Sequence, residues 1–293
     1  MNRIFFIFLI VFPLLALSQN TYVPDDNFEQ ELINYGYDTV LDDSVLTANI
    51  DTITFMSLNN QNINNLIGVE DFIALEFLSC ESNQLDSLIL DNCINLTELR
   101  CSNNNLTALD VSANIALKKL TCGKNPLTII DLSNNINLEV AHLYNCNLIS
   151  IDLNGATNLG LLFIDDNQLT SLDISNNINL KILYAINNNL SSLDLRNGNK
   201  DNLDINVMQN PDLYCISVDD TALANINWTV NNSIDPQHYF SLDCNATAIN
   251  ETSHQEKQLL KIVDILGKES KSKKGLLFYI YSNGAVEKRI VIE

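Results

Sequence analysis

The chain of 293 residues contains 36 acidic residues against 16 Lys and Arg, so its formal net charge at pH 7 is −20. A surface with this excess of negative charge repels phosphate backbones and anionic lipids, which excludes nucleic acid as a favoured partner. Cations, basic proteins and neutral glycans remain compatible partners, and the charge could also serve solubility alone.

Residues 1–18 have the pattern of an export signal. Arg3 precedes an apolar run from Ile4 to Leu17, and the small residues Ala16 and Ser18 fit cleavage after Ser18. The run is shorter than the ~20 apolar residues that a membrane-spanning helix needs. The sequence therefore predicts an exported protein that does not span the membrane, with residues 1–18 removed as a signal peptide.

Residues 19–52 are predicted to cap the N-terminal end of the fold. Pro24 and the two aspartates that follow it offer a helix start, and Gly36 offers a stop. The apolar residues between them recur on one helical face: Phe28, Leu32 and Tyr35. We expect this face to cover the first turn of the repeats that follow.

Residues 53–212 repeat with a period of 21. The leucines that open six consecutive copies lie at this interval: Leu75, Leu96, Leu117, Leu138, Leu159 and Leu180. The shared pattern, Leu-x-x-Leu-x-(Leu/Cys/Ile/Ala)-x-x-Asn-x-Leu, resembles the leucine-rich repeat family. The resemblance implies a mainly β solenoid whose concave side is a parallel sheet of about eight short strands, because one strand per repeat buries its apolar side only when the repeats stack.

Two polar rows accompany the leucines. Where each strand turns inward, an asparagine amide can donate to and accept from main-chain groups that lose their ladder partners. These asparagines are Asn83, Asn104, Asn125, Asn167 and Asn188, with Cys146 in their place in one copy. On the convex side an aspartate stands between two apolar residues of a short extended segment, at Asp110, Asp131, Asp152, Asp173 and Asp194. Each aspartate could cap its own turn, or the row could recruit Ca²⁺.

The cysteines inside the repeats are expected to remain free. Cys80, Cys101 and Cys122 fall at the same inward position of adjacent strands, where a thiol acts as a small hydrophobe. Cys93 and Cys146 are also predicted to stay unpaired. Since the sequence has no Cys-x-x-Cys pair and no spaced His pair, we expect no metal site and no cofactor.

Residues 213–247 lose the period and resemble the C-terminal cap of secreted leucine-rich repeat proteins from Gram-negative bacteria that use type IX secretion. Cys215 and Cys244 bracket this segment. In the oxidising compartment that export implies, we expect the two cysteines to form a disulfide that closes the cap.

Residues 248–293 begin as a polar linker and continue as three short apolar runs, 259–266, 275–281 and 285–292, which predict a small antiparallel unit. The turn Asp264–Lys268 and the terminal Lys288–Glu293 resemble the end of the type IX (Por-type) sorting domain. The resemblance implies an address read by the type IX secretion machinery at the Gram-negative outer membrane, with the protein placed on the cell surface or outside the cell. A last β-unit of the folded body is the alternative.

Catalysis is not expected. The chain has 3 His residues, and it lacks Gly-x-Ser-x-Gly, His-Glu-x-x-His and a glycine-rich phosphate loop after a strand. The sequence therefore predicts that the protein is not an enzyme.

The repeat register predicts a concave face that is polar in its first half and apolar-aromatic in its second. Aromatic side chains on a rigid sheet supply contact area at small entropic cost. The predicted ligand-binding residues are Val140, His142, Tyr144, Leu161, Phe163, Asp165, Tyr184 and Ile186. We predict adhesion to a protein or glycan through them. Ordinary β-propensity, self-association through this face and a Ca²⁺-stabilised structural spacer are the alternatives.

Overall fold

The computed structural model describes residues 19–198, 203–230, 232–244, 259–263, 275–281 and 286–291. It divides into two compact units, Met1–Cys244 and Asn245–Glu293, which are considered separately. The predicted signal peptide lies outside the described residues, and the domain boundaries proposed from the sequence stay predictions. Among the described residues, no helix has the length and apolar character needed to cross a membrane.

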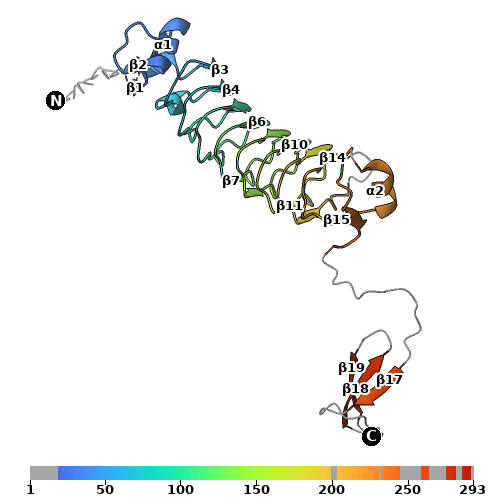
Figure 1. The fold of residues 1–293 in the computed structure, drawn as a ribbon. Helices are drawn as coiled ribbons and strands as arrows, with labels where there is room; N and C mark the ends of the chain where they lie inside the picture. The colour runs from blue at the N-terminus through green and yellow to red at the C-terminus, as the bar shows by residue number, and fades with distance from the viewer. Residues whose placement is uncertain are drawn as a thin grey trace, which may run out of the picture. The chain divides into compact units, whose positions relative to one another are not determined.

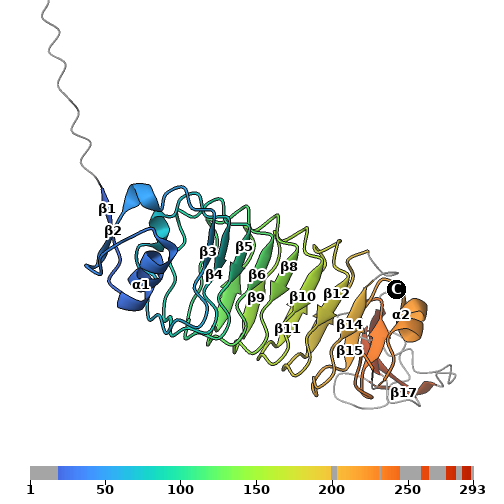
Figure 2. The same ribbon diagram turned by 90° about the horizontal axis from the view of Figure 1, so that it is seen from above.

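One parallel sheet of eight strands runs along the repeats of the first unit, between its two caps, and is called the concave sheet below (Figure 2). Each strand is the start of one repeat, and the register advances by one repeat per strand, as Leu162 opposite Leu183 illustrates. The strands, in spatial order, are β3 (Phe55–Ser57), β4 (Phe77–Ser79), β5 (Glu98–Arg100), β6 (Lys119–Thr121), β8 (Val140–His142), β10 (Leu161–Phe163), β12 (Ile182–Tyr184) and β14 (Asp204–Asn206). The predicted solenoid is confirmed.

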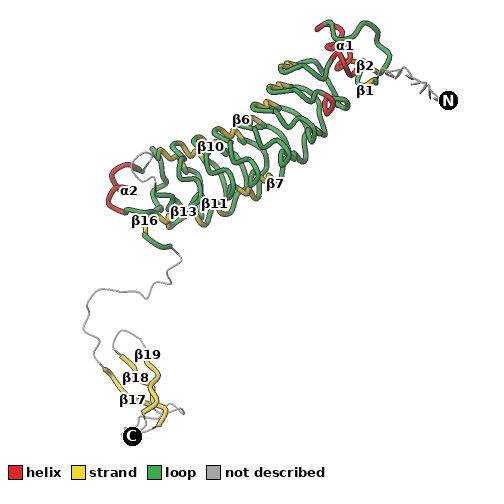
Figure 3. Tube along the Cα trace, turned by 180° about the vertical axis from the view of Figure 1, so that it is seen from behind, coloured by secondary structure: helices red, strands yellow, loops and turns green. Residues whose placement is uncertain are grey.

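The opposite side of the solenoid carries shorter parallel ladders (Figure 3). They are β7 (Ile129–Asp131) with β9 (Ser150–Asp152), and β11 (Ser171–Asp173), β13 (Ser192–Asp194), β15 (Cys215–Ser217) and β16 (Tyr239–Ser241). The predicted extended segment around Asp110 forms no strand. Asp110 accepts a hydrogen bond from the main-chain N–H of Ser112 at 2.9 Å, and hydrogen bonds from Ser112 lower the pKa of its carboxyl. The same turn recurs at the other four aspartates.

The predicted asparagine ladder is confirmed, and it holds neighbouring coils together. Asn125 is 2% exposed; its Nδ2 donates to the carbonyls of Cys101 and Cys122, at 3.0 and 2.9 Å. Its Oδ1 accepts from the N–H of Leu106 at 3.0 Å. Asn210 continues the row at its C-terminal end.

A second buried asparagine row was not predicted. Asn135 donates from Nδ2 to the carbonyls of Val111 and Asn114, at 3.0 and 3.1 Å. Its equivalents in other coils are Asn114, Asn177 and Asn197, all buried. The sequence signal is an asparagine three residues before the opening leucine of a copy, as in Asn135 before Leu138.

The N-terminal cap combines a two-stranded antiparallel sheet with one helix at the blue end of Figure 1. Its elements are β1 (Asn20–Tyr22), α1 (Asp26–Tyr35), β2 (Ser44–Leu46) and two 3-10 turns, η1 (Thr47–Asn49) and η2 (Val69–Asp71). Asp25 caps α1 by accepting from the N–H groups of Asn27 and Phe28, and the helix ends at Gly36, whose φ is 80°.

The predicted apolar face of α1 is only partly right. Phe28 and Leu32 are fully buried, whereas Tyr35 is 41% exposed. Because the helix ends one residue later, the Tyr35 ring lies at the rim, where its hydroxyl donates to the carbonyl of Ser57 at 2.8 Å. The third buried position is Glu29, whose carboxylate accepts the N–H groups of Asp42, Asp43 and Ser44.

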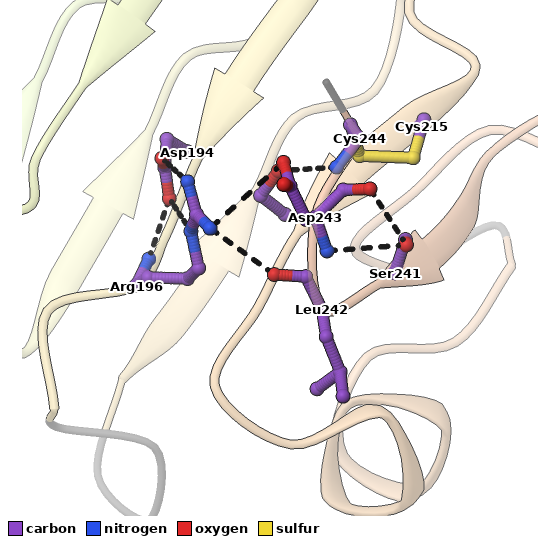
Figure 4. The surroundings of a disulfide bond; sticks show 8 residues. Asp194, Arg196, Cys215, Ser241, Leu242, Asp243 and Cys244 are labelled. Carbon is purple, nitrogen blue, oxygen red and sulfur yellow. Dashed lines mark hydrogen bonds and ion pairs between the residues drawn. A yellow bond between two sulfur atoms is a disulfide. The ribbon is translucent and has the colours of Figure 1, made fainter. Parts of the chain in front are cut away.

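The C-terminal cap contains α2 (Thr221–Asn227) and the predicted disulfide between Cys215 and Cys244, with a Cα–Cα distance of 5.7 Å. Figure 4 shows Arg196 beside this bond, donating to the Asp194 carboxylate and, at 3.2 Å, to the carbonyl of Leu242. These contacts fasten the end of the cap to the convex side. The other five cysteines are free and buried, as predicted.

Replacing both bonded cysteines, Cys215→Ser with Cys244→Ser, is expected to lower the stability of the cap by about 3.5 kcal/mol, because the bond closes a long loop in the unfolded chain. The loop spans a sequence separation of 29. Thermal melting checks this value. A reductant should lower the melting temperature of the wild type to that of the variant and leave the melting temperature of the variant unchanged. A wild type whose melting temperature is insensitive to reductant would contradict this prediction.

The second unit is a three-stranded antiparallel sheet, β17 (Leu259–Val263), β18 (Gly275–Tyr281) and β19 (Val286–Val291). β18 is central, with Phe278 opposite both Val263 and Lys288. The three apolar runs do form an antiparallel unit. Its role as a sorting address stays a prediction.

Candidate binding surface

Three adjacent strands of the concave sheet, β8, β10 and β12, bring together most of the residues predicted to bind ligand. Their register places His142, Phe163 and Tyr184 in one row across the sheet, called the aromatic column below. The rings of His142 and Phe163 stack at 4.5 Å, and Tyr184 meets Phe163 edge to face at 5.4 Å. All three side chains are half-buried, so each ring is held by its neighbours and keeps an exposed part.

A second, aliphatic row lies beside the aromatic column on the same strands. It consists of Val140, Leu161 and Ile182, all half-buried. The remaining predicted residues follow the strands and are also partly exposed: Tyr144, Asp165 and Ile186. The structure thus places all eight predicted residues on one face of three neighbouring coils, together with Ile182.

Polar groups border the aromatic column. The carboxylate of Asp204 raises the pKa of Tyr184, whose hydroxyl donates to Asp204 Oδ2 at 3.4 Å. Burial raises the pKa of Asp165, and its Oδ1 accepts the N–H of Ile186 at 2.8 Å. Burial lowers the pKa of His142, so its imidazole is mostly neutral at pH 7. The surface is therefore uncharged along the column and negative at one border.

The first half of the concave sheet is not uniformly polar, and that prediction was wrong. Phe55 and Phe77 open β3 and β4, and their rings stack at 4.6 Å. The guanidinium of Arg100 lies 5.5 Å from the Phe77 ring. Since both phenylalanines stand at the outward first position of their strands, the repeat register already placed them on this face.

The charged centre of the sheet lies between the two aromatic groups. Arg100 pairs with Glu98 on the same strand, and Lys119 Nζ lies 3.9 Å from Glu98 on the next. A shallow hollow runs from these side chains to Val140 and His142. The concave sheet thus has a polar centre with an aromatic group on either side.

Among the described residues, three carboxylates lie close enough to share one ion: Glu29, Asp38 and Asp42. They belong to the N-terminal cap, and Glu29 already accepts three main-chain N–H groups. This cluster is not part of the aromatic column.

No family model matches the sequence, and no curated protein matches it. Several solved structures do match this chain. Internalin C2 from Listeria monocytogenes shares 24% identity over 72% of this chain and 95% of that protein, with a TM-score of 0.57. The internalin InlF of the same species shares 20% identity over 70% of this chain and 61% of that one, with a TM-score of 0.51. The functional domain of InlJ, which includes a cysteine ladder, matches with a TM-score of 0.36 and 21% identity over 76% of this chain and 70% of that one.

The likenesses to internalin C2 and InlF show that this chain has a leucine-rich repeat fold. Identities this low show the fold alone, so the eight ligand-binding residues remain a prediction.

Proposed function

We propose that this protein binds another macromolecule, a protein or a glycan, through the aromatic column and the aliphatic row beside it. The observation that supports the proposal is the packing of His142, Phe163 and Tyr184 in register on a rigid parallel sheet. Ordered rings lose little entropy on binding, and the aliphatic row beside them widens the surface that a ligand can cover.

Ordinary strand propensity explains the same residues less well. Propensity stabilises a sheet wherever its strands lie, yet the centre of this sheet presents Glu98, Arg100 and Lys119. Apart from Phe55 and Phe77 on β3 and β4, the outward aromatic and aliphatic residues of the sheet concentrate on β8, β10 and β12. A local concentration of this kind is what a binding surface requires.

We further propose that the protein acts outside the cell. The apolar segment before Ser18 and the Cys215–Cys244 disulfide support export. The sequence of the second unit supports recognition by type IX machinery, with a final place at the surface of a Gram-negative cell or beyond it. A role in adhesion without catalysis agrees with these features.

The test compares the wild type with a Phe163→Ser/Tyr184→Ser variant on an array of glycans and candidate surface proteins. The matched control is Phe55→Ser/Phe77→Ser, which removes the other aromatic pair of the same sheet. All three proteins are first shown to melt alike. We expect the Phe163/Tyr184 variant to lose at least about tenfold in affinity, as hot-spot truncations do, while the control keeps its ligand.

Two outcomes would contradict the proposal. In one, no protein binds anything or all three bind equally. In the other, only the Phe55/Phe77 variant loses its ligand, which would move the binding surface to the N-terminal strands.

A further inference from the structure

A stripe of exposed isoleucines runs along the turns between each convex segment and the next concave strand. Its members are Ile73, Ile94, Ile115, Ile136 and Ile178, each 52% to 61% exposed, with Thr157 in the one remaining copy. We call these six residues the isoleucine stripe. They follow one another at the repeat period of 21 residues, so the stripe is roughly 24 Å long at ~4.8 Å per coil.

Neither local propensity nor packing accounts for the isoleucine stripe. All six positions lie in turns, where Gly, Asn, Asp, Ser and Pro are favoured and a β-branched residue brings no advantage. More than half of each isoleucine side chain remains in water, so burial within one chain does not explain it either. A recurrent apolar residue at an exposed turn indicates a surface that is covered by something else.

A charged row lies three residues beyond the isoleucine stripe and is held in step by the main chain. Its members are Glu76, Thr97, Lys118, Glu139, Gly160 and Lys181. The main-chain N–H of each member donates to the carbonyl of the preceding member at 2.8 Å. The first of these bonds joins Thr97 to Glu76, and the last joins Lys181 to Gly160. The four charged side chains are exposed, and no ion pair is seen for any of them within the described part of the chain.

The charged row is complementary to its own reverse. When a second copy meets the stripe antiparallel, about a twofold axis between Lys118 and Glu139, each row faces itself in reversed order. Glu76 then faces Lys181, and Lys118 faces Glu139, while Thr97 faces Gly160. Every charged residue of the row meets the opposite charge.

The same twofold axis also pairs the residues of the isoleucine stripe with one another, and it pairs the residues that lie three positions before the stripe. Ile73 meets Ile178, Ile115 meets Ile136, and Ile94 meets Thr157. On the other side of the stripe, Asp91 faces Asn154, so no like charges are brought together there. One operation thus satisfies the apolar residues and the charges together.

We infer that the isoleucine stripe is the interface of an antiparallel, twofold symmetric dimer of this chain. The net charge of −20 makes two copies repel over most of their surface, which leaves a self-complementary band as the place where they can meet. A stripe this narrow covers less than the ~800 Å² per partner of a standard interface, so we expect a dimer with a Kd on the order of micromolar.

Sedimentation velocity of the full chain, at concentrations from about 1 to 100 µM, measures the dimer Kd directly. We expect Ile115→Asn/Ile136→Asn and Lys118→Glu each to raise the Kd at least tenfold. The charge swap Lys118→Glu/Glu139→Lys should restore it to within about threefold of the wild type, since each reversed charge again meets its opposite. Ile129→Asn, which changes an equally exposed isoleucine on β7, is the control and should have no effect.

A zero-length carbodiimide cross-linker tests the antiparallel arrangement of the two copies in the dimer. Glu76 and Lys181 lie five coils apart in one chain, roughly 24 Å, so a Glu76–Lys181 cross-link forms only between two copies. We expect this cross-link in the wild-type dimer and its loss in Ile115→Asn/Ile136→Asn.

Several results would overturn the inference: a wild type that stays monomeric, a dimer that the isoleucine variant leaves intact, a charge swap that fails to restore association, or a dimer without the Glu76–Lys181 cross-link. A dimer broken only by Phe163→Ser/Tyr184→Ser would place self-association on the concave sheet instead. The variants of the isoleucine stripe and of the charged row change exposed side chains, and unchanged melting confirms that each variant is folded.

Discussion

Replacing Gly155 by alanine is expected to destabilise the solenoid by about 4 kcal/mol or more, or to prevent its folding. A Cβ at this position would lie 1.6 Å from the carbonyl oxygen of Ser133 and 2.6 Å from its carbonyl carbon. Both are main-chain atoms, which cannot rotate away as a side chain can, so one coil must shift against the other. Forced overpacking in a close-packed interior ordinarily costs 1 to 3 kcal/mol, and this approach is far closer than an ordinary misfit.

The matched control is Gly160→Ala at the start of the next repeat. There the nearest atoms to a new Cβ are the carbonyl oxygens of Glu139, at 3.5 Å, and Asn179, at 3.9 Å, which is ordinary contact. Its stability should stay within about 1 kcal/mol of the wild type. Chemical denaturation of both variants is the measurement.

Equal stability of the two glycine variants would contradict the described path of this coil. Other copies hold Ala113, Asn134 and Asn176 at the position of Gly155. If Gly155→Ala were tolerated, the coil would be free to follow the path of its neighbours, and the close approach to Ser133 would not be required.

Asn125→Ala is expected to cost about 4 kcal/mol in the free energy of unfolding. The change leaves the N–H of Leu106 without its acceptor. It also removes one hydrogen bond from each of the carbonyls of Cys101 and Cys122, which keep the Asn104 amide and the Cys146 thiol as donors. Water does not reach them readily, because Asn125 is 2% exposed, and each unpaired buried group costs about 1 to 3 kcal/mol. The expected effect combines this penalty for the N–H of Leu106 with about 1 kcal/mol for each of the two lost hydrogen bonds.

Denaturant unfolding of Asn125→Ala beside Asn105→Ala tests this prediction. Asn105 is an exposed asparagine of the neighbouring coil, so its replacement should change stability by less than about 0.5 kcal/mol. Because the ladder links successive coils, the loss at Asn125 should also lower the cooperativity of unfolding. A difference between the two variants below about 1 kcal/mol would mean that the ladder amides contribute little to the stacking.

The repeat period made much of this fold predictable. It set the face of each residue in a strand, and with it the concave sheet, the inward Asn125 and the outward Phe163. It also set the buried, unpaired state of Cys80 and its neighbours. These features follow from counting along one copy, because the side-chain period of a strand is fixed.

Features that depend on contacts between coils or on the ends of helices and strands were harder to predict from the sequence. Tyr35 continues the helical period of Phe28 and Leu32, yet the helix ends beside it and the ring lies at the rim. Asn135 stands in a turn, where polar residues are common, so its burial depends on the path of the preceding coil. The isoleucine stripe was visible as a repeat, whereas its exposure and the hydrogen-bonded row beside it required the structure.

The central claim is that ligand contacts the aromatic column, and hydroxyl-radical footprinting of a captured complex tests it most directly. The extent of oxidation of each aromatic side chain is compared with and without ligand. We predict that oxidation of Tyr144, Phe163 and Tyr184 falls on binding, while that of Phe55 and Tyr239 does not change. Protection of Phe55 or Tyr239 with the aromatic column unaffected would contradict the proposed binding surface.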